Sequence, residues 1–329
     1  GAQSLVVPRS VSWRLEAGDR TVDGLTLTPS SSAEQLLDEG QVRIEVRAGG
    51  LNFRDVLVCL GMVPDVAFLG GEASGVVVEV GTGVEGFAPG DRVMGLIDAG
   101  LGPMAVTDQR LITHIPERWS FIEAATVPVV FLTAYYGLKD LAHARSGQTL
   151  LVHAATGGVG MAATQLARYW GVEVYGTASQ GKWDTLRSLG FDDDHIADSR
   201  SLGFEDQVLA ATGGHGVDIV LDSLAGPFVD ASLRLLPRGG RFLEMGKTDI
   251  RDSAQISASY PGVTYRAFDL QEAGRDRIHE ILTELTTLFE QEVIRSLPAQ
   301  IWDIRRAREA FRHFSQARHI GKIVLSLPE

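Results

Sequence analysis

The sequence predicts an α/β protein in which a mainly antiparallel β domain precedes a doubly wound parallel sheet. Two patterns support this fold class. In the first third of the chain, alternating segments such as 41–47 and 75–80 are separated by glycine turns, which is typical of antiparallel strands in a partly closed barrel. From about residue 132 onward, short apolar strands alternate with helical segments, which is typical of a parallel sheet covered on both faces.

The elements of the later part can be placed in order along the chain. Apolar runs predict strands at 149–153, 173–178, 195–198, 217–221 and 241–245, and periodic segments between them predict helices at 161–169, 183–189, 204–211 and 229–236. Two more helices are expected at 275–291 and 304–314, before a closing strand at 321–327. We therefore expect a first domain at 1–131, a parallel-sheet domain at 132–270, and a return segment at 271–329 that completes the first domain.

Composition excludes several classes of function. The formal net charge of −12 and the lack of a basic cluster argue against a nucleic-acid partner. No apolar run is long enough for a membrane span and no signal peptide is recognisable, so we expect no membrane association. The single cysteine, Cys59, rules out a disulfide within the chain, favours a cytoplasmic location and is expected to be a packing residue. A start at Gly1 without Met suggests an excised domain or a tag remnant.

The most informative segment is the glycine loop 154–160, AATGGVG, between a predicted strand and a predicted helix. Its spacing is A-x-G-x-x-G, a variant of the dinucleotide-binding fingerprint. Glycines let the backbone approach a pyrophosphate and let the helix pack on the strand, and the helix N-terminus offers N–H groups to phosphates. The candidate cofactor residues here are Thr156, Gly157, Gly158, Val159 and Gly160. The alternative is a strand-to-helix turn without a ligand.

The end of the second strand indicates which dinucleotide is bound. NAD-binding proteins place an acidic residue about 20 residues past the glycine loop, on the ribose 2′-hydroxyl. Here the strand runs into Ser179 and Lys182 without an acid, which favours a 2′-phosphate and therefore NADP. Arg200 is a candidate second cation. Alternatively, Ser179 caps the next helix and the two basic residues are only solvated.

Four segments together resemble one family over nearly the whole chain. They read LNFRDV at 51–56, GGEASG at 70–75, DSLAG at 222–226 and FLEMGKTD at 242–249. The set resembles the enoyl reductase domains of modular type I polyketide synthases and of animal fatty acid synthase, in the zinc-independent part of the medium-chain dehydrogenase/reductase superfamily. The resemblance implies a Rossmann cofactor domain, a GroES-like substrate domain, and NADPH-dependent reduction of a trans-2-enoyl thioester on an acyl carrier protein beside polyketide synthase domains such as a ketoreductase.

Zinc is not expected in this chain. Many alcohol dehydrogenases of the superfamily hold a structural zinc through four cysteines and a catalytic zinc through cysteine and histidine. One cysteine cannot form the first site, and Gly71 stands where the zinc enzymes usually have histidine before Glu72. Without a Lewis acid, the expected chemistry is reduction of an alkene rather than oxidation of an alcohol.

The resemblance also implies which residues carry the reaction. Hydride passes from C4 of NADPH to the β-carbon, and a proton then reaches the α-carbon. Lys247 and Asp269 match the lysine and aspartate discussed as proton donors in the resembling domains, and Lys247 follows Met245 and Gly246 at the carboxyl end of a strand, where ligands of doubly wound sheets bind. Water is an alternative donor, and an interdomain salt bridge without a chemical role is an alternative for the Lys247–Asp269 pair.

Three more residues are expected to line the substrate and nicotinamide side. Asn52 and Thr133 lie in motifs with that place in related reductases, although a turn asparagine and a strand-end threonine are simpler interpretations. Val63 stands where one subgroup of polyketide enoyl reductases has a tyrosine linked to a 2S methyl branch. Valine has no proton to donate, so the resemblance implies 2R products; the alternative is that Val63 only packs.

Two other functions are also compatible with the sequence. One is a free-standing quinone or enoyl-CoA reductase, which would share the glycine loop and the NADP preference. The other is a non-catalytic NADPH-binding protein.

Overall fold

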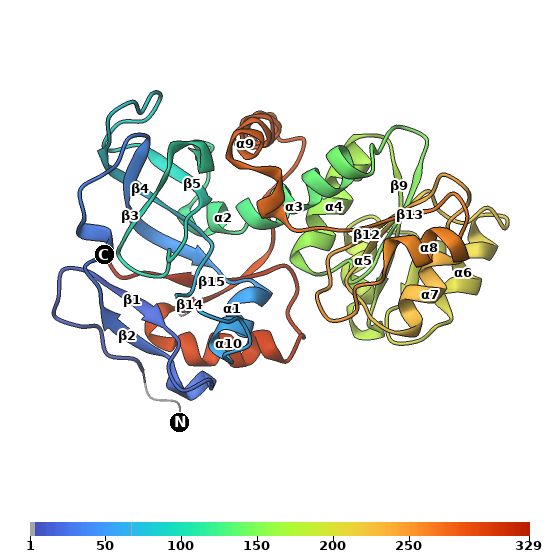
Figure 1. The fold of residues 1–329 in the computed structure, drawn as a ribbon, viewed down its shortest axis with the longest axis horizontal. Helices are drawn as coiled ribbons and strands as arrows, with labels where there is room; N and C mark the ends of the chain where they lie inside the picture. Colours follow the sequence, from blue (N-terminus) through green and yellow to red (C-terminus); the bar gives the residue numbers. More distant parts are fainter. Residues whose placement is uncertain (1–3, 67) are drawn as a thin grey trace. The chain divides into compact units, whose positions relative to one another are not determined.

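The computed structural model describes residues 4–66 and 68–329, and their contacts divide the chain into two compact units (Figure 1). The first, which we call the β unit, comprises Gly1–Val129 and Gly274–Glu329. The second, the α/β unit, comprises Val130–Ala273. The chain passes from one unit to the other within helix α3 (Pro128–Tyr135), which begins with a proline at a position that tolerates it.

A mixed sheet organises the β unit. Its order is β14 (Ala299–Asp303), β15 (Lys322–Ser326), β3 (Gln41–Gly50), β4 (Glu72–Val80), β5 (Arg92–Leu96) and β7 (Ile112–His114), with β6 (Met104–Asp108) also paired to β3. β15 runs antiparallel to β3, so the last strand of the chain shares a sheet with the first third. β1 (Trp13–Glu16) and β2 (Thr26–Pro29) form a separate antiparallel pair.

Helices and alternating strands build the core of the β unit. Val42, Ile44 and Val46 on β3 are buried, as the alternating sequence predicts, and Phe311 on α10 packs in the same core. The helical segments of this unit are η1 (Val22–Gly24), η2 (Ser32–Glu34), α1 (Phe53–Cys59), η3 (Gln109–Leu111), α2 (Phe121–Ala125), α9 (Arg275–Glu290), η8 (Ile304–Arg306) and α10 (Ala307–Ser315).

A parallel sheet organises the α/β unit. Its order is β10 (Ile196–Asp198), β9 (Glu173–Ala178), β8 (Thr149–Val152), β11 (Ile219–Asp222), β12 (Arg241–Glu244) and β13 (Thr264–Ala267), with every neighbouring pair parallel. The chain moves outward from β8 in one direction and then returns to continue from β11 in the other. The order therefore reverses between β8 and β11, and the loops after such strands are where doubly wound sheets bind ligands.

The helices of the α/β unit connect these strands. After α3 they are η4 (Tyr136–Leu141), α4 (Gly158–Tyr169), η5 (Gln180–Lys182), α5 (Trp183–Ser188), η6 (Asp193–His195), α6 (Phe204–Ala211), α7 (Pro227–Leu233), α8 (Ser253–Ser259) and η7 (Leu270–Ala273). None of the helices in residues 4–66 and 68–329 combines the length and apolar character that crossing a membrane requires.

The predicted fold class is confirmed. Some elements, such as β13 and α8, were not predicted, and several predicted elements differ from the observed ones at their ends. Helix α4 begins at Gly158, three residues before the apolar periodicity starts, because the glycine loop itself forms the first turn. Helix α7 ends at Leu233 rather than at 236, since Pro237 disfavours helical geometry in the residue before it. Thr133 lies inside α3, so its interpretation as a strand-end residue is wrong.

Candidate functional site

The glycine loop joins β8 to α4 through a tight backbone turn. Ala154 has a positive φ of 53°, and its carbonyl accepts a 3.0 Å hydrogen bond from the Gly157 N–H. A Cβ on Gly160 would lie 2.4 Å from the Ala154 oxygen and 2.8 Å from the Ala155 Cα. Only glycine fits at 160, because real Cβ atoms do not approach backbone so closely. The loop therefore lies directly against the first turn of α4.

Three predicted cofactor residues, Gly158, Val159 and Gly160, form that first turn, with Gly157 as the N-cap. The first N–H groups of a helix have no partner within the helix, so they are available to an anion. Thr156 is buried beside them. These features fit a pyrophosphate.

A buried histidine, His153, lies between the end of β8 and the glycine loop. His153 is 1% exposed, and its two ring nitrogens hydrogen-bond to Thr177 Oγ1 at 2.9 Å and to Ser232 Oγ at 2.8 Å. Burial lowers the pKa of His153 to about 3, so the ring is neutral at physiological pH. The histidine thus links β8, β9 and α7 at the point where the glycine loop leaves the sheet.

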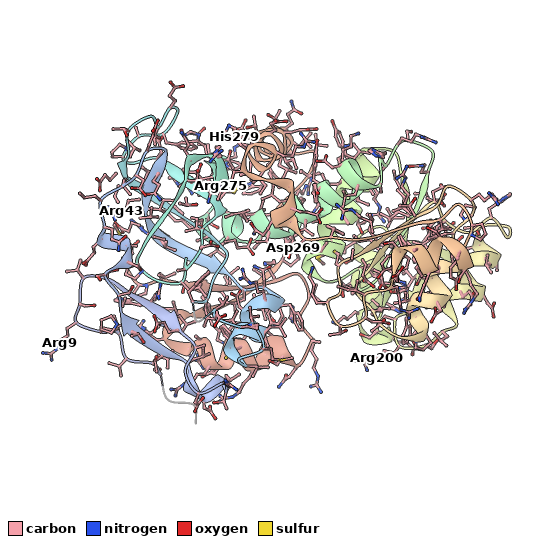
Figure 2. The ribbon with its side chains drawn as sticks, viewed as in Figure 1. Arg9, Arg43, Arg200, Asp269, Arg275 and His279 are labelled. Atoms are coloured by element: carbon pink, nitrogen blue, oxygen red, sulfur yellow. The ribbon has the colours of Figure 1, made fainter. Side chains whose placement is uncertain are left out.

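The end of β9 carries the residues predicted to bind a 2′-phosphate. Ser179 directly follows the strand and precedes η5, but its side chain makes no capping bond there, contrary to the capping alternative. Lys182 ends η5, and burial together with the positive charge of Arg200 lowers the Lys182 pKa. Arg200 follows the neighbouring strand β10 in the same unit, where its backbone N–H bonds to Asp198 (Figure 2). Two cations therefore act on each other at this end of the sheet.

Lys247 and Asp269, the second of which is labelled in Figure 2, both belong to the α/β unit. The Lys247 Nζ lies 3.7 Å from Asp269 Oδ2 and donates a 3.1 Å hydrogen bond to the Phe268 carbonyl. The two residues form a salt bridge, as the alternative interpretation predicts, but it lies within one unit rather than between domains. About half of each side chain is exposed. Met245 and Gly246 start the loop after β12, and the Gly246 N–H donates to Glu244 Oε2 at 3.1 Å.

Asn52 belongs to a buried polar network in the β unit rather than to a simple turn. Its amide nitrogen donates to Glu72 Oε2 at 2.7 Å, and its amide oxygen accepts from Lys322 Nζ at 2.9 Å. Lys322 also donates to Glu72 Oε2 at 2.6 Å, and Glu72 Oε1 accepts from the Val129 N–H at 3.1 Å. The negative Glu72 and the positive Lys322 therefore fix the orientation of the Asn52 amide.

Asp55 completes this region of the β unit. One carboxylate oxygen accepts from the Asn52 N–H at 2.8 Å and the other from the Gly70 N–H at 2.8 Å. Burial is the largest influence on Asp55 and raises its pKa. The segments LNFRDV and GGEASG thus meet through Asp55, Asn52 and Glu72.

Two other residues noted in the sequence are packing residues in the β unit. Val63 is half-buried and packs against the core of this unit, as its simpler interpretation predicts. Cys59 is fully buried, and burial raises the pKa of its thiol to about 11, which makes it a poor nucleophile.

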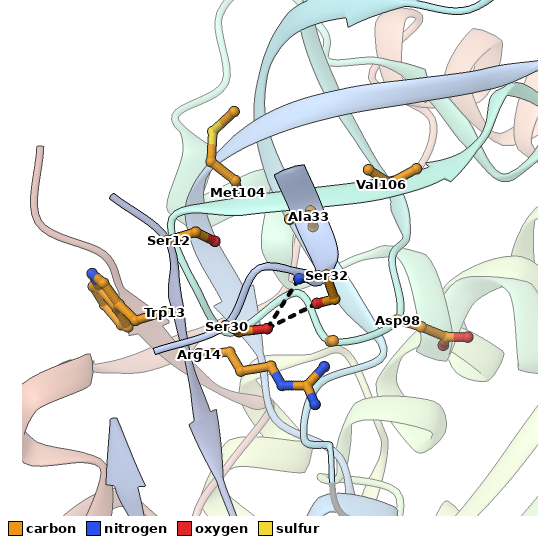
Figure 3. A pocket seen from close by; sticks show the side chains of 11 residues that line it. Ser12, Trp13, Arg14, Ser30, Ser32, Ala33, Asp98, Met104 and Val106 are labelled. Carbon is orange, nitrogen blue, oxygen red and sulfur yellow. Dashed lines mark hydrogen bonds between the residues drawn. The ribbon is translucent and has the colours of Figure 1, made fainter. Parts of the chain in front are cut away.

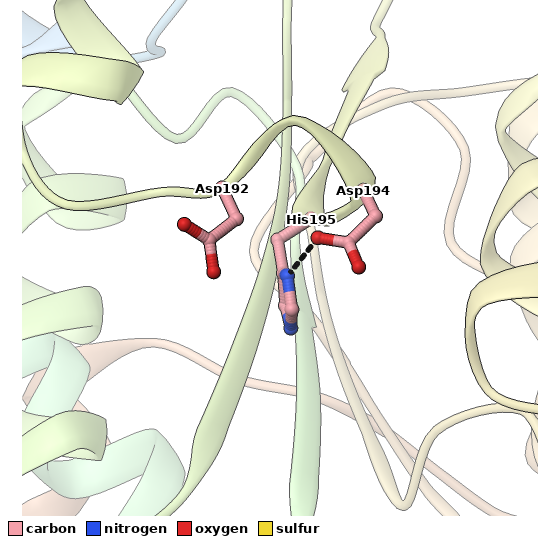
Figure 4. Close-up of side chains that lie close together, drawn as sticks. All are labelled: Asp192, Asp194 and His195. Atoms are coloured by element: carbon pink, nitrogen blue, oxygen red, sulfur yellow. Dashed lines mark hydrogen bonds and ion pairs between the residues drawn. The ribbon is translucent and has the colours of Figure 1, made fainter.

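A zinc site does not fit the residues around Glu72. Gly71 offers no side chain, and the Glu72 carboxylate already binds Lys322, Asn52 and Val129. Within residues 4–66 and 68–329, the one group of three or more metal-ligating side chains with atoms within 4.8 Å of one another is Asp192, Asp194 and His195 in the loop before β10 (Figure 4). His195 is engaged there by Asp194 and by Glu173 at 2.7 Å each.

A pocket of about 160 Å³ opens in the β unit, away from the predicted residues (Figure 3). Its polar lining includes Arg14, Asp98, Ser30 and Ser32. Arg14 is already paired with Glu16 at 2.8 Å. None of the residues that line this pocket belongs to the predicted site.

Sequence reasoning missed Glu72 and Lys322 as partners of Asn52, and it missed the acids Asp222 and Glu244. One signal was available for Lys322 and Glu244. Each is a charged residue directly beside a run of apolar strand residues, and such a residue is seldom buried unless it is paired.

Two family models match the chain. The alcohol dehydrogenase GroES-like domain matches residues 38–111, and the zinc-binding dehydrogenase model matches residues 191–325. The first match lies in the β unit, and the second begins in the α/β unit and extends into the returning segment.

The similar curated proteins are large synthases. The chain is 59% identical over 320 residues to the pikromycin polyketide synthase component PikAII of Streptomyces venezuelae, covering 96% of this chain and 9% of that protein. It is 61% identical over 330 residues to the phenolphthiocerol synthesis polyketide synthase type I Pks15/1 of Mycobacterium marinum, covering 99% of this chain and 16% of that protein. The chain therefore spans less than a fifth of the length of either relative.

Solved structures of similar length identify the part that is matched. The CurK enoyl reductase is 39% identical with a TM-score of 0.92, and the match covers 97% of this chain and all of that one. The JamJ enoyl reductase, in its apo form, is 32% identical with a TM-score of 0.90 and the same coverage. The chain belongs to the enoyl reductase domains of type I polyketide synthases, which are oxidoreductases of the medium-chain dehydrogenase/reductase superfamily.

Proposed function

We propose that the chain reduces the α,β double bond of a trans-2-enoyl thioester carried on an acyl carrier protein, with NADPH as the reductant, during polyketide chain assembly. The observation that carries the cofactor assignment is that the positive charge of Arg200 acts on Lys182 just past β9, whose own last residues include no acid, in the same unit as the glycine loop. A 2′-phosphate would relieve the repulsion between these two cations, whereas the 2′-hydroxyl of NAD would not.

The chain's own residues provide a cradle for the dinucleotide. Thr156 to Gly160 would hold the pyrophosphate through backbone N–H groups at the start of α4. Ser179, Lys182 and Arg200 would hold the 2′-phosphate, and Met245, Gly246 and Thr133 would border the nicotinamide. NADPH, when bound, supplies the hydride for the β-carbon. The likeness to a mycobacterial protein solved in complex with NADPH, at 25% identity and a TM-score of 0.86, supports this cofactor.

Lys247 is the proposed source of the second hydrogen. Its ammonium transfers a proton to the α-carbon, so that an N–H bond breaks and a C–H bond forms, and water then returns a proton to the amine. Asp269, 3.7 Å away, holds the ammonium form and orients it. A positioned acid of this kind contributes about 10²–10⁴-fold to a reaction step.

The assay that tests the function uses the chain with NADPH and a crotonyl pantetheine thioester, with a quinone in a parallel reaction. The expected result is NADPH consumption with the thioester only. Consumption with the quinone alone would assign a quinone reductase, and binding of NADPH without turnover of either would assign a non-catalytic protein.

The proton source is tested with Lys247→Ala, with Lys139→Ala on η4 as the matched control. In deuterated water, the Lys247 variant should lose about 10²-fold or more in turnover and alter deuterium incorporation at the α-carbon. Unchanged turnover and unchanged incorporation would overturn the assignment and leave water as the donor.

Val63 carries the proposal for stereochemistry. A valine has no proton to supply from its side, so a 2-methyl-enoyl thioester should give mainly the 2R product. Chiral analysis of the reduced product tests this, and a mainly 2S product would contradict it. Asn52 is proposed to border the substrate near Val63, with its amide held by Glu72 and Lys322.

The proposed partners are the carrier protein and neighbouring polyketide synthase domains such as a ketoreductase. The chain is acidic overall, with a formal net charge of −12, so attraction of an acidic carrier protein would have to depend on local patches. Tethering within one polypeptide raises the effective concentration and lessens the need for strong contacts.

A further inference from the structure

Two carboxyl groups are buried side by side where β11 and β12 end. Asp222 and Glu244 are paired in register on these adjacent parallel strands, and they are 0% and 1% exposed. Neighbouring strands lie about 4.8 Å apart and residues in register point to the same face, so the two side chains are within reach of each other. This register places the two carboxyl groups where they can bond to each other. A hydrogen bond between two carboxyl groups requires one of them to carry a proton.

One oxygen of each carboxyl group accepts a hydrogen bond from the backbone, and the other oxygen faces no backbone donor. Asp222 Oδ1 accepts from the Leu224 N–H at 3.2 Å, and Glu244 Oε2 accepts from the Gly246 N–H at 3.1 Å. Among the described residues, Asp222 Oδ2 and Glu244 Oε1 have no hydrogen-bond partner, so they are the atoms that a shared proton would join. Two negative charges at this separation in a dry interior would repel each other strongly.

Burial and mutual repulsion decide which group holds the proton. Burial raises the pKa of both groups, and the neighbouring Asp222 carboxyl raises the pKa of Glu244 further, to about 9. Glu244 is therefore protonated at neutral pH and Asp222 is ionised. The other charged or titratable groups that act on the pair are Asp249, Arg251 and Tyr265.

The pair supports two loops that are tied to each other. The Met245 N–H donates to the Asp222 carbonyl at 2.9 Å, and the Gly226 N–H donates to Asp249 Oδ2 at 2.7 Å. Arg251 bonds to Asp249, to Asp230 and to the Gly226 carbonyl. These contacts join DSLAG to the FLEMGKTD segment, so the loop that carries Lys247 is held from both sides.

We propose that Asp222 and Glu244 are positioning residues that share one proton and thereby hold the Lys247 loop in place, and that loss of this proton releases the loop. This inference rests on the proposed function only for the role of Lys247. When both carboxylates are ionised, their repulsion weakens the bonds to Leu224 and Gly246 that anchor the two loops.

The key variant is Glu244→Gln, which keeps the size of the side chain, a donor toward Asp222 and an acceptor for Gly246, but cannot ionise. Because the Glu244 pKa is raised in the folded protein, the stabilising contribution of its proton is full below the unfolded pKa of about 4.5 and is lost as the pH rises through about 9. Between pH 6 and pH 9, the unfolding equilibrium constant of the wild type should therefore rise relative to that of Glu244→Gln by about tenfold per pH unit.

Two comparisons complete the experiment. Asp222→Asn removes the negative charge that faces Glu244 and should weaken the same pH dependence. It also gives a second test where Glu244→Gln does not fold. Asp206→Asn, at an exposed acid on α6, is the control and should follow the wild type.

The functional readout is the pH profile of NADPH-dependent thioester reduction. As the pH rises, the turnover of the wild type should fall at a lower pH than the turnover of Glu244→Gln. If the pair only stabilised the fold at neutral pH, the two profiles would not differ in this way. Parallel pH dependences of unfolding in the wild type and in either variant would overturn the shared proton. If the turnover of the wild type and of Glu244→Gln falls at the same alkaline pH while their unfolding equilibria differ, the role of the pair in positioning Lys247 would be overturned. If no variant and no wild-type sample reduces the thioester at any pH, the proposed function fails, and the unfolding measurements still decide the inference about the pair.

Discussion

Lys322 donates a 2.6 Å hydrogen bond to Glu72 inside the β unit, where the two side chains are 3% and 0% exposed. The pair joins β15, the last strand of the chain, to β4, although β3 lies between them in the sheet. Lys322 also donates to the Leu51 carbonyl and to Asn52, so each proton of its ammonium has a protein acceptor. The charge of Lys322 is thus fully paired and hydrogen-bonded, which is the condition for burying it.

Replacing Lys322 with methionine should destabilise the protein by about 3–5 kcal/mol, because Glu72 would be left as an uncompensated buried charge. Urea unfolding measures the loss. The double variant Lys322→Met with Glu72→Leu should recover most of it, since replacing both partners by apolar groups removes the unpaired charge. Arg305→Met, at an exposed ion pair with Asp303, is the control and should cost at most about 1 kcal/mol. If Lys322→Met and Arg305→Met lost the same free energy of unfolding, the explanation by an uncompensated buried charge would be contradicted.

The sequence predicted the strands and helices well because their signals are local. The β9 strand and the α6 helix begin and end at the predicted residues, since each has its own apolar pattern and clear flanking turns. The glycine loop was also recognisable, because its function depends on consecutive backbone positions. The network around Asn52 was not predictable in this way, since its partners Glu72 and Lys322 are 20 and 270 residues distant in the chain.

The acids Asp222 and Glu244 illustrate the same limit. Both lie in motifs of the sequence. Asp222 directly follows the predicted strand 217–221 and is the last residue of the observed β11, whereas Glu244 lies within the predicted strand 241–245. That the two face each other depends on the order of the strands and on their register, which no local pattern contains. A search for charged residues within apolar strands would have marked Glu244 but not its partner.

Gly160→Ala should distort the glycine loop, because the new Cβ would lie 2.4 Å from the Ala154 oxygen, which is backbone and cannot rotate away. Such overpacking costs about 1–3 kcal/mol. We expect NADPH affinity to fall at least tenfold, measured by calorimetric titration, together with a lower melting temperature. Gly203→Ala is the control, because glycine 203 has helical geometry and its new Cβ would meet only the Ser201 hydroxyl at 3.3 Å. Unchanged NADPH binding by Gly160→Ala would show that the loop does not hold the cofactor.

Lys182→Met and Arg200→Met should each weaken NADPH binding about tenfold to a hundredfold and leave NADH binding nearly unchanged. The reason is that a hydrogen bond to a charged group is worth about 1.5–3 kcal/mol, and only NADPH has the 2′-phosphate that would receive it. Titrations with both cofactors at two salt concentrations measure the effect, and salt should reduce the preference. Lys139→Met is the matched control. A similar loss of affinity for NADH and NADPH would argue that these cations stabilise the loop rather than recognise the phosphate.

His153 should make the protein sensitive to acid. Burial lowers its pKa from 6.5 to about 3, so the folded protein excludes a proton that the unfolded chain binds. The stabilising contribution of neutral His153 is therefore full above about pH 6.5 and is lost as the pH falls toward 3, at about 1.4 kcal/mol per pH unit. Urea unfolding of the wild type and of His153→Gln between pH 8 and pH 4.5 measures this slope.

The variant separates His153 from the carboxylates that also titrate in acid. Glutamine can bond to Thr177 and Ser232 but does not ionise, so His153→Gln should be less stable than the wild type at pH 8 and approach or exceed it at low pH. His215→Gln, at an exposed histidine in the same unit, should follow the wild type throughout. Parallel pH dependences in the wild type and in His153→Gln would mean that the ring has the same pKa in the folded and unfolded protein, and would contradict the burial of a neutral ring beside the glycine loop.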